Sequence, residues 1–342
     1  MATGGRRDAA ALEEGLGRWV VARPDQVPTV AGDPETPPRL RAVAHADGGL
    51  ANETVLVDLG PARSGVVVRL PPLRPTFPGY ELAPQAVVQN AVAAAGVPAP
   101  APSVVVDDPA WIGSPFLAMP LVPGDIAGPA PAFDDYVTSA GTEAQARMHD
   151  GLVDVVAAVH AVDWRAAGLD AVVPGTTTRD ALARWQAYVE WSSGGDPLPA
   201  LAQALDWCGD RVPPEGEQVL LWGDVRLGNL VFDPERRVRA VLDWDLASVG
   251  PAEMDLAWYL ALEDMMVSLF ARRVEGFGTR QQTIARYEAR SGRTLSDLEW
   301  HEVFALVRAL AINDRHQRIS GDPRRTKNPM GALLLDRLGA AS

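Results

Sequence analysis

The sequence has almost no cysteine and little histidine, and both shortages exclude kinds of site. Cys208 is the single cysteine among 342 residues, which excludes an internal disulfide framework and a cysteine-based zinc site. The five histidines show no ligand spacing such as His-Glu-x-x-His. We therefore expect no structural metal.

Long apolar runs and an excess of basic residues are also lacking. No stretch reaches the roughly 18 apolar residues of a membrane span, and the N-terminal residues show no secretion signal, so we expect a cytoplasmic protein without a membrane partner. The formal net charge of −13 argues against a nucleic-acid partner. It is compatible with a cationic substrate, although it equally fits a generally acidic protein. Lys327 is the single lysine.

The first third of the chain is predicted to be rich in strands. Two apolar runs flank a turn that contains proline, serine and glycine, which indicates a hairpin, and Gly96 and Pro98 end a helix. The expected helices cover residues 9–21 and 82–95, and the expected strands cover residues 53–58, 65–70, 104–106 and 116–119.

The remainder is predicted to be mainly helical, with one small β unit inside it. Ser296 and Glu299 have the spacing of a capping box. With a hinge at Pro120–Gly124, the chain is an α+β protein that has a small β-rich N-lobe, residues 1–119, and a larger helical C-lobe, residues 120–342. The expected helices are 145–162, 178–191, 198–208, 252–272, 281–291 and 297–315, and the strands are 219–222, 229–232 and 238–242.

Three polar side chains are predicted to converge in that β unit. Asp224 follows one strand, Asn229 begins the next, and Asp243 follows the return strand. Because residues 229–242 form a hairpin, its two ends meet at one edge. Carboxylate and amide oxygens are ligands that Mg²⁺ takes together with phosphate oxygens and water. The spacing therefore indicates a site for a divalent cation and a phosphate.

These residues carry a family resemblance. Asp224-x₄-Asn229 followed by Asp243-Trp-Asp245 resembles the catalytic and metal loops of the protein-kinase-like fold, in its aminoglycoside phosphotransferase/choline kinase branch. The sequences of these motifs are similar to those of the kinase-like domain that accompanies some acyl-CoA dehydrogenases. The stretches that carry this similarity are 48–54, 159–168, 223–233 and 240–251. The resemblance covers roughly residues 25 to 320 and implies a two-lobed fold that uses ATP and Mg²⁺.

The resemblance also implies roles for the loop residues. Asp224 would orient and deprotonate the acceptor hydroxyl, and Asn229 and Asp243 would hold Mg²⁺. Arg226 stands where a protein kinase has a lysine that touches the transferring phosphate, with a solvated loop arginine as the alternative. Asp255 would brace the catalytic loop.

The nucleotide clamp of the N-lobe is implied less directly. Arg69 stands where the fold has a phosphate-gripping lysine, with a surface arginine as the alternative. Asn52 ends a loop in the place of a phosphate-covering loop, although a plain turn fits equally. Met119 precedes the hinge, and the Pro120 carbonyl and the Val122 amide would meet adenine.

Two positions depart from the family pattern. Gln85 stands where a glutamate pairs with the phosphate-gripping cation, and Trp222 replaces the histidine before Gly223. Glutamine can accept a hydrogen bond but brings no charge. Both changes keep open an alternative function, that of a catalytically impaired nucleotide-binding or scaffold protein.

The leading hypothesis is a small-molecule kinase that moves the γ-phosphate of ATP to a hydroxyl. Two acceptors compete, a hydroxyacyl-CoA-like metabolite and a cationic aminoglycoside-like compound. Carboxylates on the C-lobe pocket wall would favour the second, and arginines beside an apolar slot would favour the first. The sequence leaves the acceptor, the choice between ATP and GTP and the oligomeric state open.

Overall fold

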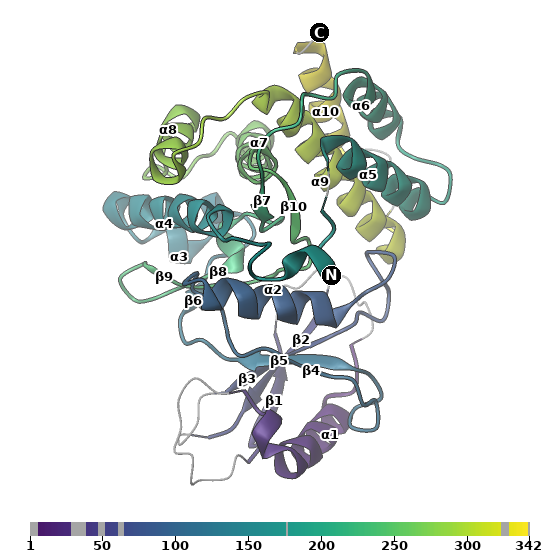
Figure 1. Ribbon diagram of the computed structural model, residues 1–342, viewed down its shortest axis with the longest axis vertical. Coiled ribbons are helices and arrows are strands. Elements are labelled where there is room, and N and C mark those ends of the chain that lie inside the picture. The colour runs from purple at the N-terminus through teal and green to yellow at the C-terminus, as the bar shows by residue number, and fades with distance from the viewer. Residues whose placement is uncertain are drawn as a thin grey trace. The chain divides into compact units, whose positions relative to one another are not determined.

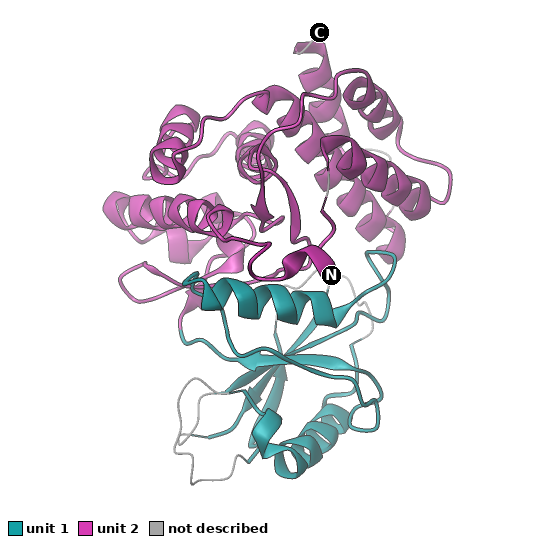
Figure 2. Cartoon of the chain, viewed as in Figure 1, with its two compact units in different colours: residues 1–123 teal, residues 124–342 magenta. Residues whose placement is uncertain are grey.

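The structure is a computed structural model that describes residues 6–28, 39–46, 52–60, 65–175, 177–322 and 328–340. The chain forms two compact units, Met1–Pro123 and Gly124–Ser342, which are coloured separately in Figure 2. Each unit is described by itself. Among the described residues, no helix combines the length and the apolar character that crossing a bilayer requires.

Unit 1 contains an antiparallel five-stranded sheet in the order β1-β2-β3-β5-β4. The predicted hairpin is confirmed as β2 and β3, which pair Val55 with Val68. Strand β1 was not predicted. The helices are α1 (Ala9–Ala22), a 3₁₀ turn η1 (Pro24–Gln26) and α2 (Leu82–Ala94), and the strands are β1 (Ala42–His45), β2 (Glu53–Asp58), β3 (Val66–Leu70), β4 (Val104–Val106) and β5 (Phe116–Pro120).

The two faces of this sheet are covered by different helices. Alternate residues of a strand point to opposite faces, so Val68, Leu70 and Phe116 pack with Trp19 of α1. Their neighbours Leu117 and Met119 pack instead with Leu82 and Ala86 of α2. Helices α1 and α2 therefore lie on opposite sides of the sheet (Figure 1). The alternation places Arg69 on the α2 face.

Unit 2 is mainly helical and holds two small sheets, β7 with β10 and β6-β8-β9. Its helices are α3 (Asp135–Thr138), α4 (Thr142–His160), α5 (Thr178–Ser193), α6 (Pro199–Asp210), α7 (Glu253–Phe270), α8 (Arg280–Ser291), α9 (Leu298–Ser320) and α10 (Pro329–Ala340). Its 3₁₀ turns are η2 (Pro131–Phe133), η3 (Leu169–Ala171) and η4 (Leu227–Asn229), and its strands are β6 (Asp125–Ile126), β7 (Gln218–Leu221), β8 (Leu230–Phe232), β9 (Val238–Val241) and β10 (Ser248–Pro251).

Helix α9 is the centre of unit 2. It contacts α5, α6, α7 and α10, and its residues from Trp300 to Ala311 are buried on every side. A helix that is buried all round must be surrounded by other elements. Its neighbour α7 begins directly after β10 and carries Asp255 and Trp258, so the packing of α7 on α9 fixes the position of both residues.

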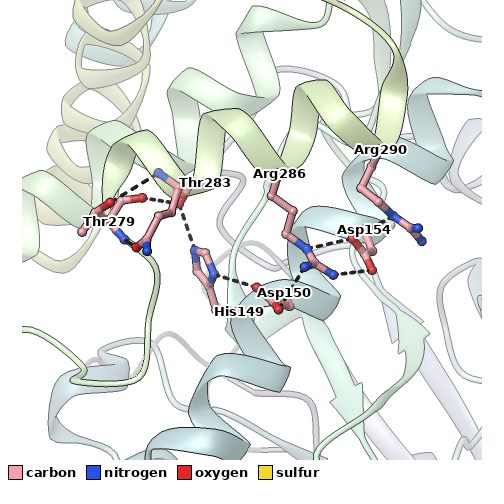
Figure 3. Close-up of polar contacts among 8 residues, drawn as sticks. His149, Asp150, Asp154, Thr279, Thr283, Arg286 and Arg290 are labelled. Carbon is pink, nitrogen blue, oxygen red and sulfur yellow. Dashed lines mark hydrogen bonds and ion pairs between the residues drawn. The ribbon is translucent and has the colours of Figure 1, made fainter.

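Helices α4 and α8 are joined by a polar clasp, shown in Figure 3. The Arg286 guanidinium donates from Nε and Nη2 to the two oxygens of Asp154 at 2.9 and 2.8 Å, and its Nη1 lies 3.0 Å from Asp150 Oδ2. The buried His149 ring nitrogen Nε2 shares a hydrogen bond of 3.0 Å with the Thr283 hydroxyl. The clasp fixes α8 against α4 through side chains rather than through a large apolar face.

The helices and strands expected from periodicity are present, and one expected detail is wrong. The predicted capping box at Ser296 does not form, because Asp297 precedes α9 with a left-handed φ of 50° and makes no side-chain cap. The Ser296 N–H instead donates to Glu253 Oε1 at 3.0 Å. This contact with the start of α7 takes the place of a local cap.

Candidate active site

The loop from Gly223 to Asn229 and the end of the β8–β9 hairpin form one site in unit 2. Leu230 pairs with Val241, and the Leu242 N–H donates to the Asn229 carbonyl at 2.8 Å. Asn229 and Asp243 therefore lie at the same end of the hairpin, as the sequence predicts. Gly223 has a φ of +90°, and a Cβ there would lie 2.2 Å from the Leu246 carbonyl oxygen, so only glycine fits at this bend.

Three side chains hold the Asp224 carboxylate. The Trp258 indole donates to Oδ1 at 3.1 Å, while Arg226 Nε and Asn229 Nδ2 donate to Oδ2 at 2.9 and 2.8 Å. The side chain of Asp224 is 19% exposed. Oδ2 is thus occupied by two donors, whereas Oδ1 has a single donor and keeps the capacity to accept another proton or hydrogen bond.

Arg226 pairs with Asp224 and is partly exposed. Its Nε atom pairs with Asp224, and its side chain is 36% exposed. The guanidinium has five N–H donors, of which this bond uses one. Arg226 therefore lies at the carboxylate, with part of its side chain exposed to solvent.

Asn229 and Asp243 can each offer a side-chain oxygen atom to a metal ion. Asn229 Nδ2 donates to the backbone carbonyl and to the side chain of Asp224, so Asn229 Oδ1 is turned away from Asp224. Asp243 has a left-handed φ of 62°, which is uncommon for a residue other than glycine and is found at functional sites. The described residues contain no group of three or more histidine, cysteine or acidic side chains that could hold a metal ion by itself. One amide and one carboxylate fit Mg²⁺ that completes its shell with phosphate oxygens and water.

Asp255 braces the loop from beneath, as predicted. Its carboxylate is 1% exposed and accepts from the Trp222 and Gly223 N–H groups at 2.7 and 2.9 Å. His160 Nε2 lies 3.1 Å from the same carboxylate, and His160 Nδ1 lies 2.8 Å from the Tyr287 hydroxyl. His160 is therefore a satisfied core histidine that links α8 and α4 to the base of the catalytic loop.

Trp222 ties the end of β7 to the end of the β8–β9 hairpin. Its fully buried indole donates to the Leu242 and Asp243 carbonyls at 2.9 and 3.2 Å. A histidine at this position would offer a hydrogen bond as well, so the indole keeps a donor in the loop and adds apolar packing against Trp244.

Two residues beside Asp224 were not found from the sequence. Trp258 donates to the carboxylate, and the buried Arg308 donates from Nη2 to the Gly223 carbonyl at 3.0 Å. Burial lowers the pKa of Arg308 to about 10, against the opposing effect of Asp255 and Asp224, so the side chain is charged at neutral pH. A signal was present, because Arg308 interrupts a run of apolar residues in the middle of a helix.

The residues proposed for the nucleotide lie in unit 1, at the α2 face of its sheet, at the end of β5 or just before β2. Arg69 is buried in β3, and Gln85 is buried in α2. Gln85 Nε2 donates to the Glu81 carbonyl at 3.1 Å, and its Oε1 accepts no hydrogen bond from the described residues. Met119 and Pro120 end β5, Val122 follows, and Asn52 precedes β2. The glycine-containing stretch 47–51 lies outside the described residues.

Comparison with known sequences gives the family. Residues 43–319 match the sequence profile of the phosphotransferase enzyme family, which is well over half of the chain. The chain belongs to this family.

Two curated relatives show a more particular similarity. The chain is 29% identical over 231 residues to acyl-CoA dehydrogenase family member 11 of Gallus gallus, and 28% identical over 215 residues to acyl-CoA dehydrogenase family member 10 of Mus musculus. These matches cover 66% and 62% of this chain but 29% and 19% of the relatives. The chain therefore spans less than a third of the length of these proteins, and the predicted resemblance to a domain that accompanies acyl-CoA dehydrogenases is confirmed.

Solved structures confirm the kinase-like α+β fold. A candidate aminoglycoside phosphotransferase from Ralstonia eutropha aligns over 95% of this chain and 97% of its own, with a TM-score of 0.72 and 23% identity. A GDP complex of aminoglycoside 2'-phosphotransferase-IIIa aligns over 96% and 99%, with a TM-score of 0.58 and 15% identity. A choline kinase from Streptococcus pneumoniae aligns over 88% and 94%, with a TM-score of 0.55 and 11% identity. At these identities the likeness concerns the fold alone.

Proposed function

We propose that the protein is a small-molecule kinase that transfers the γ-phosphate of ATP to a hydroxyl. The observation that carries the proposal is the arrangement around Asp224. Its carboxylate is held by Arg226 and Asn229 of its own loop and by Trp258 of α7, and the loop ends at Asn229 beside the Asp243 turn. A base next to oxygen ligands for a divalent cation is the combination that phosphoryl transfer needs.

Asp224 orients the acceptor hydroxyl and takes its proton through Oδ1. The acceptor oxygen then forms a bond to the γ-phosphorus while the bond between that phosphorus and the β–γ bridging oxygen breaks, and ADP leaves. Asn229 and Asp243 would hold Mg²⁺, which would supply positive charge to balance that of the phosphates. Arg226 reaches the transferring phosphate with the guanidinium donors that Asp224 does not use.

The residues of unit 1 hold the nucleotide in this proposal. Arg69 grips the phosphates, and the uncharged Gln85 supports it only by a hydrogen bond. The adenine ring lies at Met119, Pro120 and Val122 in this proposal. Asn52 lies at the phosphates. Because a structural relative is a GDP complex, ATP and GTP are both tested as donors in the experiments below.

A hydroxyacyl-thioester-like acceptor is favoured over an aminoglycoside-like one. The side chains that donate to the Asp224 carboxylate are Trp258, Arg226 and Asn229, which include one aromatic ring and one cation. Cationic and aromatic surroundings suit an anionic acceptor with an apolar part. The similarity to parts of acyl-CoA dehydrogenase family members supports the same choice.

A screen of acceptors tests the activity. Transfer of labelled γ-phosphate from ATP and from GTP is measured with a panel of hydroxyacyl-CoAs, free hydroxy acids and aminoglycosides. We expect transfer to at least one hydroxyacyl compound. Transfer to aminoglycosides alone would overturn the acceptor, and nucleotide binding without transfer or hydrolysis would favour the alternative of a nucleotide-binding or scaffold protein, which the lack of charge at Gln85 motivates.

The metal role is tested with Asp243→Ala. The change removes one of two protein ligands, so calorimetry should show that the gain in ADP affinity on adding Mg²⁺ falls by about tenfold or more, since altered metal surroundings typically weaken affinity by 10–100-fold. Glu235→Ala, at a 59% exposed side chain in the turn of the same hairpin, is the control. An unchanged effect of Mg²⁺ in Asp243→Ala would contradict the metal assignment.

A further inference from the structure

Arg308 is a buried cation that contacts the catalytic loop without an ion pair. Its side chain is 6% exposed, and its Nη2 atom donates to the Gly223 carbonyl at 3.0 Å. The structure shows no carboxylate oxygen within 4.0 Å of it among the residues that it describes, and its buried Nε atom has no hydrogen-bond partner there. A buried charge without a direct counter-ion destabilises the folded state, because the charge has lost its water shell. The presence of Arg308 therefore calls for an explanation.

Two indole rings offset part of the desolvation free energy of this guanidinium. The Arg308 guanidinium lies 4.6 Å from the Trp258 ring centroid and 5.2 Å from that of Trp185. Arginine stacks on aromatic faces through its planar, weakly hydrated guanidinium, and a lysine or an apolar side chain would not do so in the same way. One of these rings, Trp258, is also the donor to Asp224 Oδ1.

Arg308 therefore reaches the base by two short routes. Through the Gly223 carbonyl it holds the peptide that joins Gly223 to Asp224, and Asp255 accepts from the Gly223 N–H at 2.9 Å. Through Trp258 it holds the ring that points its N–H at the carboxylate. The backbone and the side chain of the same residue are thus set by one guanidinium on α9.

We propose that Arg308 is a positioning residue for phosphoryl transfer, which fixes the Asp224 carboxylate through the Gly223 carbonyl and the Trp258 indole. The proposal rests on the proposed function, in which Asp224 is the base. It extends the site from the catalytic loop to the central helix of unit 2. A 1 Å displacement of a reacting group can lower the rate about 100-fold, so a support of this kind would act on turnover more than on substrate affinity.

Arg315 provides a matched control on the same helix. It lies seven residues further along α9, and its guanidinium stacks on Trp191 at 4.4 Å, so it repeats the stacking of an arginine on an α5 tryptophan. Neither Arg315 nor Trp191 belongs to the catalytic loop or contacts Asp224 in the bonds described above. Loss of stacking alone should thus affect both arginines alike, whereas loss of positioning should affect Arg308 only.

The test compares Arg308→Met, Arg308→Lys and Arg315→Met in the full chain. Methionine is of similar length and apolar, and a buried ion replaced by a well-packed apolar side chain often leaves stability unchanged. We measure kcat and KM for hydrolysis of Mg-ATP, with water as the acceptor, and hydrogen exchange of the backbone amides in residues 222–229. Thermal unfolding confirms that each variant is folded.

We expect Arg308→Met to lower kcat by about 10- to 100-fold with KM for Mg-ATP within about threefold, and to speed exchange in residues 222–229. Arg308→Lys should recover part of both, because it keeps a donor for Gly223, and Arg315→Met should match the wild type. Equal kcat and equal exchange in Arg308→Met and Arg315→Met would overturn the proposal. If Asp224→Asn kept full turnover, the base assignment would fail, and the exchange of residues 222–229 would still decide whether Arg308 orders the loop.

Discussion

At the scale of residues, the Asp224 carboxylate is defined by the donors around it. Its two oxygens differ, because Oδ2 receives Arg226 and Asn229 while Oδ1 receives Trp258 alone. Hydrogen bonds to a carboxylate are stronger than those between neutral groups and fix its plane. The oxygen with fewer donors is the one that can meet an acceptor hydroxyl.

Replacing Trp258 with phenylalanine removes one donor and keeps an aromatic ring in place. A hydrogen bond to a charged group contributes about 1.5–3 kcal/mol, so Trp258→Phe should lower kcat by at least about tenfold and leave KM for Mg-ATP nearly unchanged. Steady-state kinetics checks this. Trp191→Phe, at a ring 36% exposed on α5, serves as the control. Equal loss in both variants would mean that ring packing, not the N–H bond, matters.

Glu263 on α7 makes stability depend on pH. Burial raises the pKa of this carboxyl from 4.5 to about 7, with Asp264 raising it and Arg273 lowering it. Because the folded pKa lies above the unfolded one, the unfolded state binds fewer protons between pH 4.5 and 7, and stability falls as pH rises through that window. Above pH 7 the whole loss is present.

Glu263→Gln removes this titration. The variant should exceed the wild type in free energy of unfolding by roughly 1–3 kcal/mol at pH 8, and the difference should disappear toward pH 4.5. Urea unfolding at several pH values measures it, with the exposed Glu190→Gln as the control. A difference that stayed constant with pH would show that Glu263 is not the titrating group.

The sequence located those residues of the proposed site that lie close together along the chain. Asp224, Asn229 and Asp243 follow from the pattern of strands and turns, since a hairpin must return to its start. Trp258 and Arg308 reach Asp224 from positions 34 residues away and further, on α7 and α9. Helical periodicity says which residues are buried but not which other helix each one meets, so these two supports required the three-dimensional packing.

At the scale of elements, α8 depends on polar contacts with α4. Tyr287 on α8 is hydrogen-bonded to His160, which in turn is hydrogen-bonded to Asp255 beneath the loop of Asp224. The position of α8 therefore affects the support of that loop. The hydrogen bonds to Asp154 raise the pKa of Arg286 above its ordinary value. Figure 3 shows that Asp154 also lies between Arg286 and Arg290, whose Nε is 3.1 Å from it.

Asp154→Asn should loosen this clasp. The pair is partly exposed, with 29% and 33% of the two side chains accessible, so we expect a loss of only about 1 kcal/mol in stability. Hydrogen exchange of residues 280–291 should become faster. Glu143→Gln, in the exposed pair with Arg147 at 3.4 Å, should change neither quantity. Unchanged exchange in α8 would show that apolar contacts alone seat it.

Elements with strong periodicity were predicted well, and elements decided by tertiary contact were not. Helices α5 and α8 each begin at a capping box, which is formed by Thr177 with Asp180 and by Thr279 with Gln282. The expected box at Ser296 fails because Glu253 of another helix binds the Ser296 N–H. Strands β1 and β10 were missed because short edge strands owe their form to a partner strand more than to their own sequence.

At the scale of the whole molecule, each unit has its own core. Unit 1 encloses its sheet between α1 and α2, and unit 2 surrounds α9 with helices. Much of the proposed chemistry, namely the base, the metal ligands and Arg308, belongs to unit 2, whereas the proposed nucleotide contacts belong to unit 1. Substitutions in unit 2 should therefore separate turnover from nucleotide affinity.

Asp224→Asn tests the central claim most directly. Turnover of Mg-ATP, with water or the best acceptor of the panel, is measured beside the affinity for Mg-ADP by calorimetry. We predict that turnover falls by about 100- to 10,000-fold, the usual contribution of a general base, while the affinity for Mg-ADP stays within a few-fold. Equal turnover in the wild type and Asp224→Asn would contradict the account, and so would a wild-type protein that binds Mg-ATP without any turnover.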